Sequence, residues 1–244
     1  MESVLKLKNV VKYLSWNKIL KWINLDVKSW EIYWFLWPNG AWKTTTMKSI
    51  MWLIEPEEWT IEVFWEKWLT IEAKKKIGFM PENTYLYKYL TWEEFLRFNA
   101  NFFDIPKEKM ETKVKELLEK VWLTHAKDRY LNEYSKWMLQ RIGLAQAIIN
   151  EPKLVFLDEP MSWLDPLWRK MVKDFILELK DKWTTVFFNT HVLADAESMC
   201  DRISIIHKWE IIVNWEDIKN INWLENYFIE KVTWSDKEAI LDIE

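Results

Sequence analysis

Residues 37–45 combine the residue types that bind phosphate groups. Lys43 and Thr44 offer a positive charge and a hydroxyl, which suit the outer phosphates of a nucleotide and a Mg²⁺ ion. The stretch follows an apolar run at 32–36 that predicts a buried strand, and it opens a predicted helix at 44–54. A loop between a strand and a helix start is the layout of a phosphate-binding P-loop. We therefore expect a nucleotide site made by Trp37, Pro38, Asn39, Gly40, Ala41, Trp42, Lys43, Thr44 and Thr45.

Two positions of this loop conflict with phosphate binding. The P-loop pattern has glycine at both, because the backbone there turns with positive φ and touches the phosphate. This chain has Trp37 and Trp42 instead. An indole ring at either position would fill the space of the nucleotide, so the loop as written is inactive.

The composition offers a second explanation. The 20 Trp and 3 Gly together make up about 9% of the 244 residues, close to the usual glycine content of about 7%. Many of the tryptophans also stand at turn positions, as Trp30 after Ser29 and Trp215 after Asn214, where small residues are expected. We hypothesise that most Trp stand for Gly, because the source organism reads the UGA codon as glycine. The alternative is a Trp-rich chain without a working nucleotide site.

Composition and charge limit the other classes of protein. The 244 residues, half of them apolar, suit one globular domain with subdomains. A net charge of −4 argues against general nucleic-acid binding. Cys200 is the single cysteine, which excludes an internal disulfide and predicts a buried, inert thiol. We find no apolar leader and no run of 18 apolar residues, so we expect neither a signal peptide nor a membrane span.

The elements that must position the site mix strands and helices. Alternating and apolar runs predict antiparallel strands near the N-terminus, buried strands further on and a closing hairpin; helical periodicity predicts an inserted helical region. The chain is therefore predicted to be α/β. The predicted strands are 4–11, 19–27, 60–64, 77–80, 153–157, 184–188, 203–206 and 211–213, and the predicted helices are 92–121, 139–149 and the segment starting at Asp165-Pro166.

The order of the motifs resembles that of the ATP-binding cassette (ABC) ATPases over nearly the whole chain. Residues 134–141, Tyr-Ser-Lys-Trp-Met-Leu-Gln-Arg, are similar to the family signature S-K-G-M-x-Q-R if Trp137 is read as glycine. Residues 157–160, Leu-Asp-Glu-Pro, resemble the Walker B motif, and residues 162–165, Ser-Trp-Leu-Asp, resemble the D-loop. His191 falls at the switch histidine.

The resemblance implies a particular architecture. It is a P-loop NTPase (RecA-like) core with an N-terminal antiparallel β subdomain and an inserted α-helical subdomain at about 85–145. The cassette would cover 4–235, and a short tail would cover 236–244.

The resemblance also implies ATP hydrolysis, with ATP and Mg²⁺ as cofactors. Lys43 would contact the β- and γ-phosphates, and Thr44 and Asp158 would hold Mg²⁺. Glu159 would act as the general base for the attacking water, and His191 would bind the γ-phosphate and that water. The expected catalytic residues are thus Glu159, His191 and Lys43.

Three more residues have a possible role in the same site. Tyr13 would stack on the adenine, unless it is an ordinary aromatic at the end of a strand. Glu82 takes the place of the Q-loop glutamine, where a carboxylate could still bind Mg²⁺ or water; the alternative is a solvated surface acid. Asp165 belongs to the D-loop and, with Pro166 after it, is also a predicted helix N-cap.

The signature residues would act on a second cassette. In a head-to-tail dimer, homomeric or heteromeric, Ser135, Trp137 and Gln140 would cap the γ-phosphate bound by the partner. Glycine at position 137 would let the backbone approach that phosphate, whereas an indole would block closure. An ordinary helix N-cap is the alternative role for Ser135.

The resemblance implies the nucleotide-binding subunit of an ABC transporter, which drives a separate membrane permease. Such a subunit is cytoplasmic and peripheral at the inner face of the cell membrane, with no span of its own and no nucleic-acid partner. The variants at Glu82 and at the signature favour the export-type (ABC-2) group.

Two alternatives remain open. A soluble ABC ATPase would ordinarily carry two cassettes or a long coiled coil, and we expect neither here. A non-hydrolysing binding module would follow if the Trp residues are real. The aromatic residues Phe95, Phe98 and Phe102 fit either an internal core or a permease groove, so we assign no partner residue there.

Overall fold

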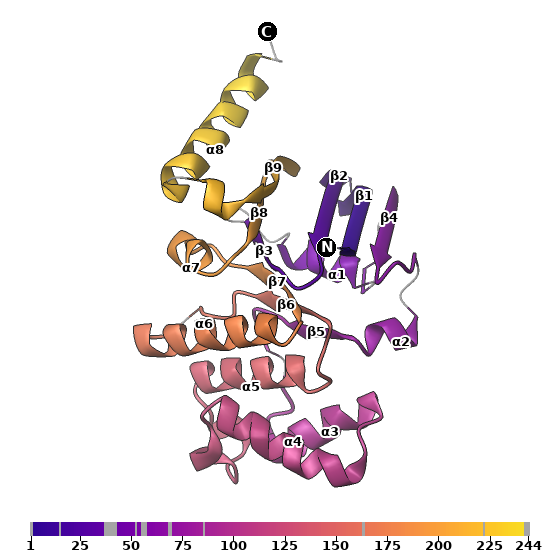
Figure 1. Ribbon diagram of the computed structural model, residues 1–244, viewed down its shortest axis with the longest axis vertical. Helices are drawn as coiled ribbons and strands as arrows, with labels where there is room; N and C mark the ends of the chain where they lie inside the picture. Colours follow the sequence, from indigo (N-terminus) through magenta and orange to yellow (C-terminus); the bar gives the residue numbers. More distant parts are fainter. Residues whose placement is uncertain are drawn as a thin grey trace.

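A computed structural model shows two β-sheets with helices packed between and around them (Figure 1). The smaller sheet is antiparallel, in the order β2-β1-β4, and the larger has the order β5-β6-β7-β3-β8-β9. Neighbouring strands of the larger sheet are parallel except in the β8–β9 hairpin. The structure describes residues 2–14, 16–36, 43–51, 53–54, 58–67, 70–84, 86–162, 164–221 and 223–241.

The bounds of the elements follow the chain in order. The strands are β1 (Ser3–Leu14), β2 (Asn17–Lys28), β3 (Ile32–Leu36), β4 (Glu58–Val63), β5 (Ile77–Met80), β6 (Leu154–Asp158), β7 (Thr185–Asn189), β8 (Arg202–His207) and β9 (Glu210–Asp217). The α-helices are α1 (Lys43–Ile50), α2 (Ile71–Lys74), α3 (Trp92–Ala100), α4 (Lys107–Lys120), α5 (Lys136–Ile148), α6 (Pro166–Asp181), α7 (Leu193–Glu197) and α8 (Leu224–Leu241). Short 3₁₀ turns are η1 (Asn101–Phe103), η2 (Thr124–Ala126), η3 (Leu131–Glu133) and η4 (Ile218–Asn220).

The parallel sheet is buried on both faces. Because successive side chains of a strand point to opposite faces, Trp34 and Leu157 enter one core while Phe35 and Phe156 enter another. The first core includes the inner sides of α5, α6 and the helices α3 and α4. The second includes α1 and the antiparallel sheet. Burial on both faces explains why these strands read as continuous apolar runs.

Helix α5 lies unusually close to the sheet. A Cβ atom on Gly78 of β5 would come within 1.9 Å of the carbonyl oxygen of Ala147. A Cβ atom on Gly143 of α5 would come within 2.3 Å of Thr84 Cγ2. Both close approaches require glycine, which sets the depth at which the signature helix packs.

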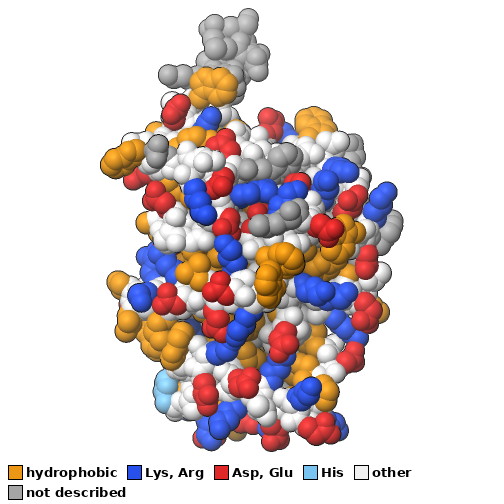
Figure 2. All heavy atoms as spheres, viewed as in Figure 1, with side chains coloured by type: hydrophobic (Ala, Val, Ile, Leu, Met, Phe, Trp, Pro, Cys, Tyr) orange, Lys and Arg blue, Asp and Glu red, His pale blue; other side chains and the backbone are white. Residues whose placement is uncertain are grey.

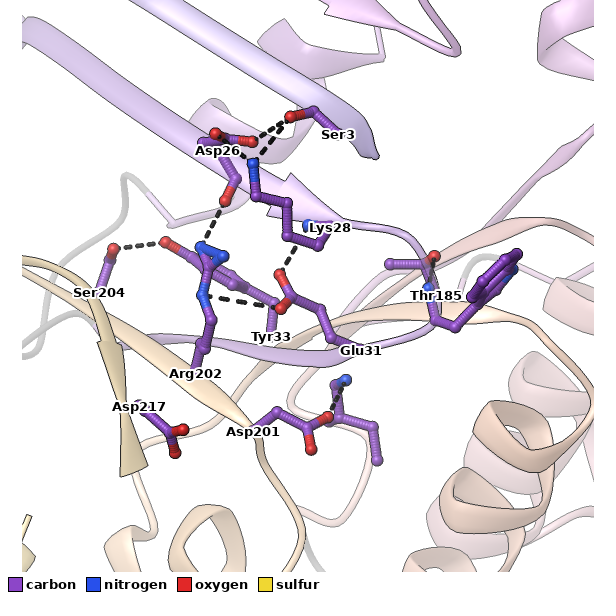
Figure 3. Close-up of polar contacts among 12 residues, drawn as sticks. Ser3, Asp26, Lys28, Glu31, Tyr33, Thr185, Asp201, Arg202, Ser204 and Asp217 are labelled. Carbon is purple, nitrogen blue, oxygen red and sulfur yellow. Dashed lines mark hydrogen bonds and ion pairs between the residues drawn. The ribbon is translucent and has the colours of Figure 1, made fainter. Parts of the chain in front are cut away.

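A buried polar cluster joins the two sheets where β3 begins (Figure 3). Glu31 accepts a hydrogen bond from the Lys28 backbone N–H at 2.7 Å, and its Oε2 lies 3.6 Å from Arg202 Nε. Arg202 also donates to the Asp26 carbonyl at 2.6 Å. Burial outweighs these contacts and raises the pKa of Glu31 to about 7. These polar contacts therefore connect β2 to β8 and to the start of β3.

Tryptophan occupies an unusual share of the positive-φ positions. Among the described residues, thirteen other than glycine have a positive φ, and seven of these are Trp. Bulky side chains rarely tolerate that conformation. The seven are Trp22, Trp30, Trp65, Trp122, Trp183, Trp209 and Trp223.

Two of these residues end helices. Trp122 (φ 53) follows α4, and Trp183 (φ 65) follows α6. The N–H of the next residue returns to a carbonyl five residues earlier, at 3.1 Å after α4 and 3.0 Å after α6. This is the Schellman motif, whose left-handed residue is usually glycine.

Two others take the second place of tight hairpin turns. Phe64 and Trp65 have φ values of 52 and 67, and the residues on either side exchange two backbone hydrogen bonds of 3.0 Å. Lys208 and Trp209, with φ values of 45 and 76, connect β8 to β9. Positive φ at both positions defines a type I′ turn, which strongly prefers glycine second.

Most predicted elements are present. The N-terminal strands, the buried strands and the β8–β9 hairpin are confirmed. The stretch 92–121 proves to be two helices, because Asp104 turns left-handed (φ 52) and Pro106 starts α4 anew. The predicted helix at 44–54 is present but shorter, from Lys43 to Ile50. The predicted boundary at 235 falls inside α8, which continues to Leu241.

Two expectations from composition concern the cysteine and the membrane. Cys200 is buried, which confirms the predicted burial, and burial raises the pKa of its thiol well above the usual value. Among the described helices, none combines the length and the apolar character that a bilayer span needs.

Candidate functional site

The carboxyl ends of the parallel strands bring the predicted site residues to one edge of the sheet. Strand β6 ends in Asp158, β7 leads to His191 and β5 leads to Glu82. Strand β3 lies beside β7 and runs into residues 37–42. This edge is where open α/β sheets bind their ligands.

The phosphate loop itself, residues 37–42, lies outside the described residues. The strand before it ends at Leu36, and the helix after it begins at Lys43. The predicted strand before the loop and the predicted helix after it are therefore confirmed. The roles of the Lys43, Thr44 and Thr45 side chains stay predictions.

Asp158 offers a buried carboxylate at the strand end. It is 1% exposed, and Asn189 Nδ2 donates to its Oδ1 at 2.8 Å. Asn189 is fully buried, and its own Oδ1 has no partner among the described residues. Mg²⁺ is usually held by one or two carboxylates together with substrate phosphates, so these oxygen atoms fit a magnesium site. The sequence motifs did not reveal Asn189.

The backbone of Glu159 is held in a left-handed conformation (φ 50). Its N–H donates to the Asn189 carbonyl at 2.9 Å. Its carbonyl accepts from Gln140 Nε2 at 2.9 Å, from Ser162 N at 3.1 Å and from Ser162 Oγ at 2.9 Å. A left-handed residue with a Cβ costs about 1–2 kcal/mol, which the surrounding hydrogen bonds must offset.

The side chain of Glu159 contacts the switch histidine. Its Oε1 lies 2.9 Å from His191 Nδ1, and its Oε2 accepts from Thr190 Oγ1 at 3.3 Å. Glu159 is 4% exposed, whereas more than half of the His191 side chain is exposed. The structure thus brings a buried carboxylate and an accessible imidazole together, an arrangement that can accept a proton from water.

The signature segment forms the start of α5. Ser135 is the N-cap and accepts from the Met138 N–H at 3.3 Å, which confirms the helix-cap role considered for it. Trp137 lies in the first turn. Gln140 is 4% exposed, and its Nε2 donates to the Glu159 carbonyl of its own chain. Its predicted contact with a partner's phosphate stays a prediction.

The indole of Trp137 packs against Arg141. The guanidinium carbon of Arg141 lies 4.3 Å from the ring centroid of Trp137 and 4.0 Å from that of Trp168. Arg141 Nη1 donates to the Val121 carbonyl at 3.0 Å, but Nε and Nη2 have no partner among the described residues. Burial lowers the pKa of Arg141 to about 10. Arg141 is thus a buried cation between two indole rings, and two of its nitrogen atoms have no hydrogen-bond acceptor among the described residues.

The remaining predicted site residues lie as follows. Tyr13 is partly exposed at the end of β1, with Lys18 Nζ 5.4 Å from its ring centroid. Glu82 is exposed just after β5. Asp165 caps α6 by accepting from two backbone N–H groups at 2.9 and 3.0 Å, and Pro166 follows it, which confirms the predicted cap.

A groove of about 990 Å³ lies at the opposite edge of the sheet, where the strands begin. Trp30, Trp65 and Trp183 line it together with lysines, and the rings of Trp30 and Trp183 are 4.8 Å apart. All three Trp have a positive φ. The groove therefore lies away from the candidate site. Its aromatic walls exist only if positions 30, 65 and 183 are Trp.

The fold and this edge of the sheet define a P-loop ATPase of the cassette type. The model of the ABC transporter family matches residues 20–162, and the chain belongs to this family, whose members hydrolyse ATP. The solved structure of an ATP-binding subunit of an ABC transporter is similar, with a TM-score of 0.85 and 26% identity over 94% of this chain and 99% of that one.

Curated relatives agree with this family. An ABC transporter ATP-binding protein of Nostoc sp. is 43% identical over 193 residues, which cover 78% of this chain and 58% of the relative. The bacitracin transport ATP-binding protein BcrA of Bacillus licheniformis is 35% identical over 211 residues, covering 85% of this chain and 68% of the relative. The chain thus spans little more than half the length of the Nostoc protein.

Proposed function

We propose that this chain binds and hydrolyses ATP as the nucleotide-binding subunit of an ABC transporter, and that it drives a separate permease. The observation that carries the proposal is the buried Glu159 carboxylate, 2.9 Å from His191 and one residue after Asp158. A base next to a metal-binding carboxylate, at the edge that receives the P-loop, is the arrangement that ATP hydrolysis needs.

Each residue has a distinct role in the proposed reaction. Lys43 binds the outer phosphates, and Thr44 and Asp158 hold Mg²⁺, with Glu82 available to it or to a water. Mg²⁺, when bound, neutralises charge on the β- and γ-phosphates. Glu159 accepts the proton of the attacking water through its carboxylate, and His191 orients that water and the γ-phosphate. Tyr13 stacks on the adenine.

A second cassette completes the site. The half-buried Ser135 and residue 137 lie at the N-terminus of the 13-residue helix α5, whose free N–H groups and dipole favour an anion. In a head-to-tail dimer this end contacts the γ-phosphate held by the partner, with the D-loop residue Asp165 nearby in the interface. Binding of ATP then closes the dimer, and hydrolysis opens it.

We infer that most Trp positions are glycine in the native protein. The backbone supports this, because seven of the Trp adopt positive φ, including two Schellman positions and two type I′ turns. Exposure supports it too, since Trp16, Trp183 and Trp223 are 96%, 66% and 79% exposed. Figure 2 shows large hydrophobic side chains standing among the charged residues of the surface. The buried Trp34 and Trp92, which lack a positive φ, lie outside this argument.

The proposed partner is a permease of the export type at the inner face of the membrane. Phe95 is buried, but Phe98 and Phe102 are 42% and 61% exposed and their rings lie 5.2 Å apart. Tyr87 joins them with its ring 5.5 Å from that of Phe98. This aromatic surface, on α3, on η1 and on the loop before α3, is the permease contact we propose. The bacitracin transport ATP-binding protein among the relatives supports a role in transport.

The first test is peptide mass spectrometry of the protein isolated from its own source, reading positions 37, 42 and 137. Glycine there restores each phosphate-binding motif, and we expect that result. Tryptophan there would overturn the inference about glycine and would favour the non-hydrolysing binding module.

The second test is an ATPase assay on the glycine form, meaning the chain made with Gly at the 18 Trp positions other than Trp34 and Trp92. Glu159→Gln should lower kcat by about 100-fold or more while ATP binding is retained, because the general base is lost. The matched control is Glu119→Gln, at an exposed position of α4, which should keep the parent rate. Full activity of the Glu159→Gln variant would exclude Glu159 as the base.

A third experiment separates the transporter from a soluble ATPase. The glycine form should co-purify with a membrane permease from its source, and replacing Phe98 and Phe102 by Ser should abolish that association while leaving ATPase activity intact. Association that survives these changes would rule out the aromatic surface as the contact.

A further inference from the structure

We propose that Gln140 is a positioning residue that couples the signature helix α5 to the catalytic Glu159 of the same chain. The role rests on the proposed function, because it assumes that Glu159 acts on the ATP of its own chain and that the start of α5 contacts the ATP of the partner.

The link is one buried hydrogen bond. Gln140 Nε2 donates to the Glu159 carbonyl at 2.9 Å, and both residues are 4% exposed. Water therefore does not compete for this bond, and its loss leaves the carbonyl with fewer donors.

The bond acts on a residue whose backbone needs outside support. Glu159 has a positive φ without being glycine. The other donors to its carbonyl both belong to Ser162, three residues further along the same turn, which moves with Glu159. Among the described residues, Gln140 is the donor to this carbonyl that comes from a distant element. It therefore fixes Glu159 relative to α5.

The same helix carries both ends of the coupling. Ser135 caps α5, and Gln140 lies little more than one turn into it, within a continuous helix that reaches Ile148. A contact that shifts the start of α5 shifts Gln140 as well, because a helix moves as a rigid unit over one turn. Engagement of the partner's ATP would thus set the position of the base that acts on the chain's own ATP.

The chain contains a matched control for this bond. Gln146 lies on the same helix, and its Nε2 donates to Asn99 Oδ1 at 3.1 Å, within the helical region. Removing either amide deletes one glutamine hydrogen bond of α5, but only Gln140 reaches Glu159.

The experiment compares Gln140→Leu with Gln146→Leu in the glycine form. We expect Gln140→Leu to lower kcat about tenfold or more, with KM for ATP unchanged within about twofold, because a small misplacement of the base affects chemistry rather than binding. Gln146→Leu should keep kcat within about twofold of the parent. Equal losses in the two variants would overturn the proposal.

A second variant distinguishes positioning from a general structural role. Gln140→Glu can donate to the Glu159 carbonyl only while its carboxyl is protonated. Burial at this position raises the pKa of an introduced carboxyl above its ordinary value, so the kcat of Gln140→Glu, relative to the parent, should fall as pH rises, whereas that of Gln140→Leu should stay constant. A flat ratio for both variants would count against a donor role.

Dimer formation supplies a readout independent of turnover. In a Glu159→Gln background, Gln140→Leu should still form the ATP-dependent dimer in size-exclusion chromatography. Loss of the dimer would assign Gln140 to the interface or to folding and would overturn the proposal. If the unsubstituted glycine form hydrolyses no ATP, the proposed function itself fails, and the positioning role fails with it.

Discussion

At Glu159 the backbone adopts a conformation that glycine would adopt more readily. Its carbonyl accepts a long-range hydrogen bond from Gln140, and its N–H donates one to the Asn189 carbonyl. At Trp183 the same backbone region belongs to the local geometry of a helix end. The two cases have different explanations. The first would place the carboxylate that we propose as the base, and the second fits our proposal that position 183 is glycine in the native protein.

Glu31 provides a test of buried polar chemistry at the residue scale. Its pKa is raised to about 7, mainly by burial, so the folded state holds its proton more tightly than the unfolded state. The stability from this proton is fully present below the ordinary value of 4.5 and is lost as pH rises towards 7. Relative to Glu31→Gln, the parent should therefore lose about 1–3 kcal/mol of unfolding free energy over this range.

Urea unfolding of the parent and of Glu31→Gln at several pH values measures this difference. The two pH profiles should diverge between about 4.5 and 7 and run parallel above that range. Profiles that stay parallel throughout would show that the Glu31 carboxyl is not perturbed by burial.

At the scale of elements, the termini of α4 and α6 follow the ordinary rules of helix ending. Asp165 and Pro166 begin α6, and the left-handed residue 183 ends it, with the following N–H bonded back into the last turn. Only the identity of residue 183 departs from those rules. The backbone thus retains a glycine-type stop although the chain shows an indole there.

This helix allows a matched pair of substitutions in the chain as printed. Trp183→Gly should raise the unfolding free energy by about 1 kcal/mol, because glycine adopts the positive φ without strain. Trp168→Gly, in the first turn of the same helix, should lower it by about 1 kcal/mol or more. Chemical denaturation measures both. A loss of stability for Trp183→Gly would contradict the glycine assignment at that position.

At the scale of the whole molecule, two cores on opposite faces of one sheet hold the catalytic edge. The face with α1 and the antiparallel sheet supports the P-loop strand, and the face with α5 and α6 supports the signature helix (Figure 1). Asp158 and Glu159 lie at the end of the strand between these cores. The architecture therefore joins the chain's own nucleotide site to the surface expected to meet a partner.

Nucleotide binding should be visible as stabilisation of the whole molecule. At an ATP concentration of about 100 times Kd, with Mg²⁺, the glycine form should gain about 2.7 kcal/mol, or roughly 5–10 °C in Tm. The chain with Trp37 and Trp42 should show no shift, because an indole at either position would occupy the space that the phosphates need. Lys43→Ala in the glycine form is the control, and its shift should be smaller. Equal shifts in the Trp and glycine forms would contradict a role for glycine in the loop.

Local patterns in the sequence were sufficient to predict the strands, most helices and the order of the motifs. Apolar runs mark the buried strands, and Asp165-Pro166 marks a helix start, because these signals depend only on neighbouring residues. The order of the motifs was sufficient to identify the family. Even the proposed substitution of Trp for Gly was visible in composition and turn chemistry.

Other features depend on which elements pack together. The sequence predicts Gln140 at a partner's phosphate, and it gives no sign that the approach of α5 to β6 places the Gln140 amide on the Glu159 carbonyl. Asn189 became visible only because β7 lies beside β6, and Phe98 proved exposed because α3 buries Phe95 and turns Phe98 outward. Strand order and helix packing bring together residues that are far apart in the chain. A local sequence pattern cannot predict which of these residues come into contact.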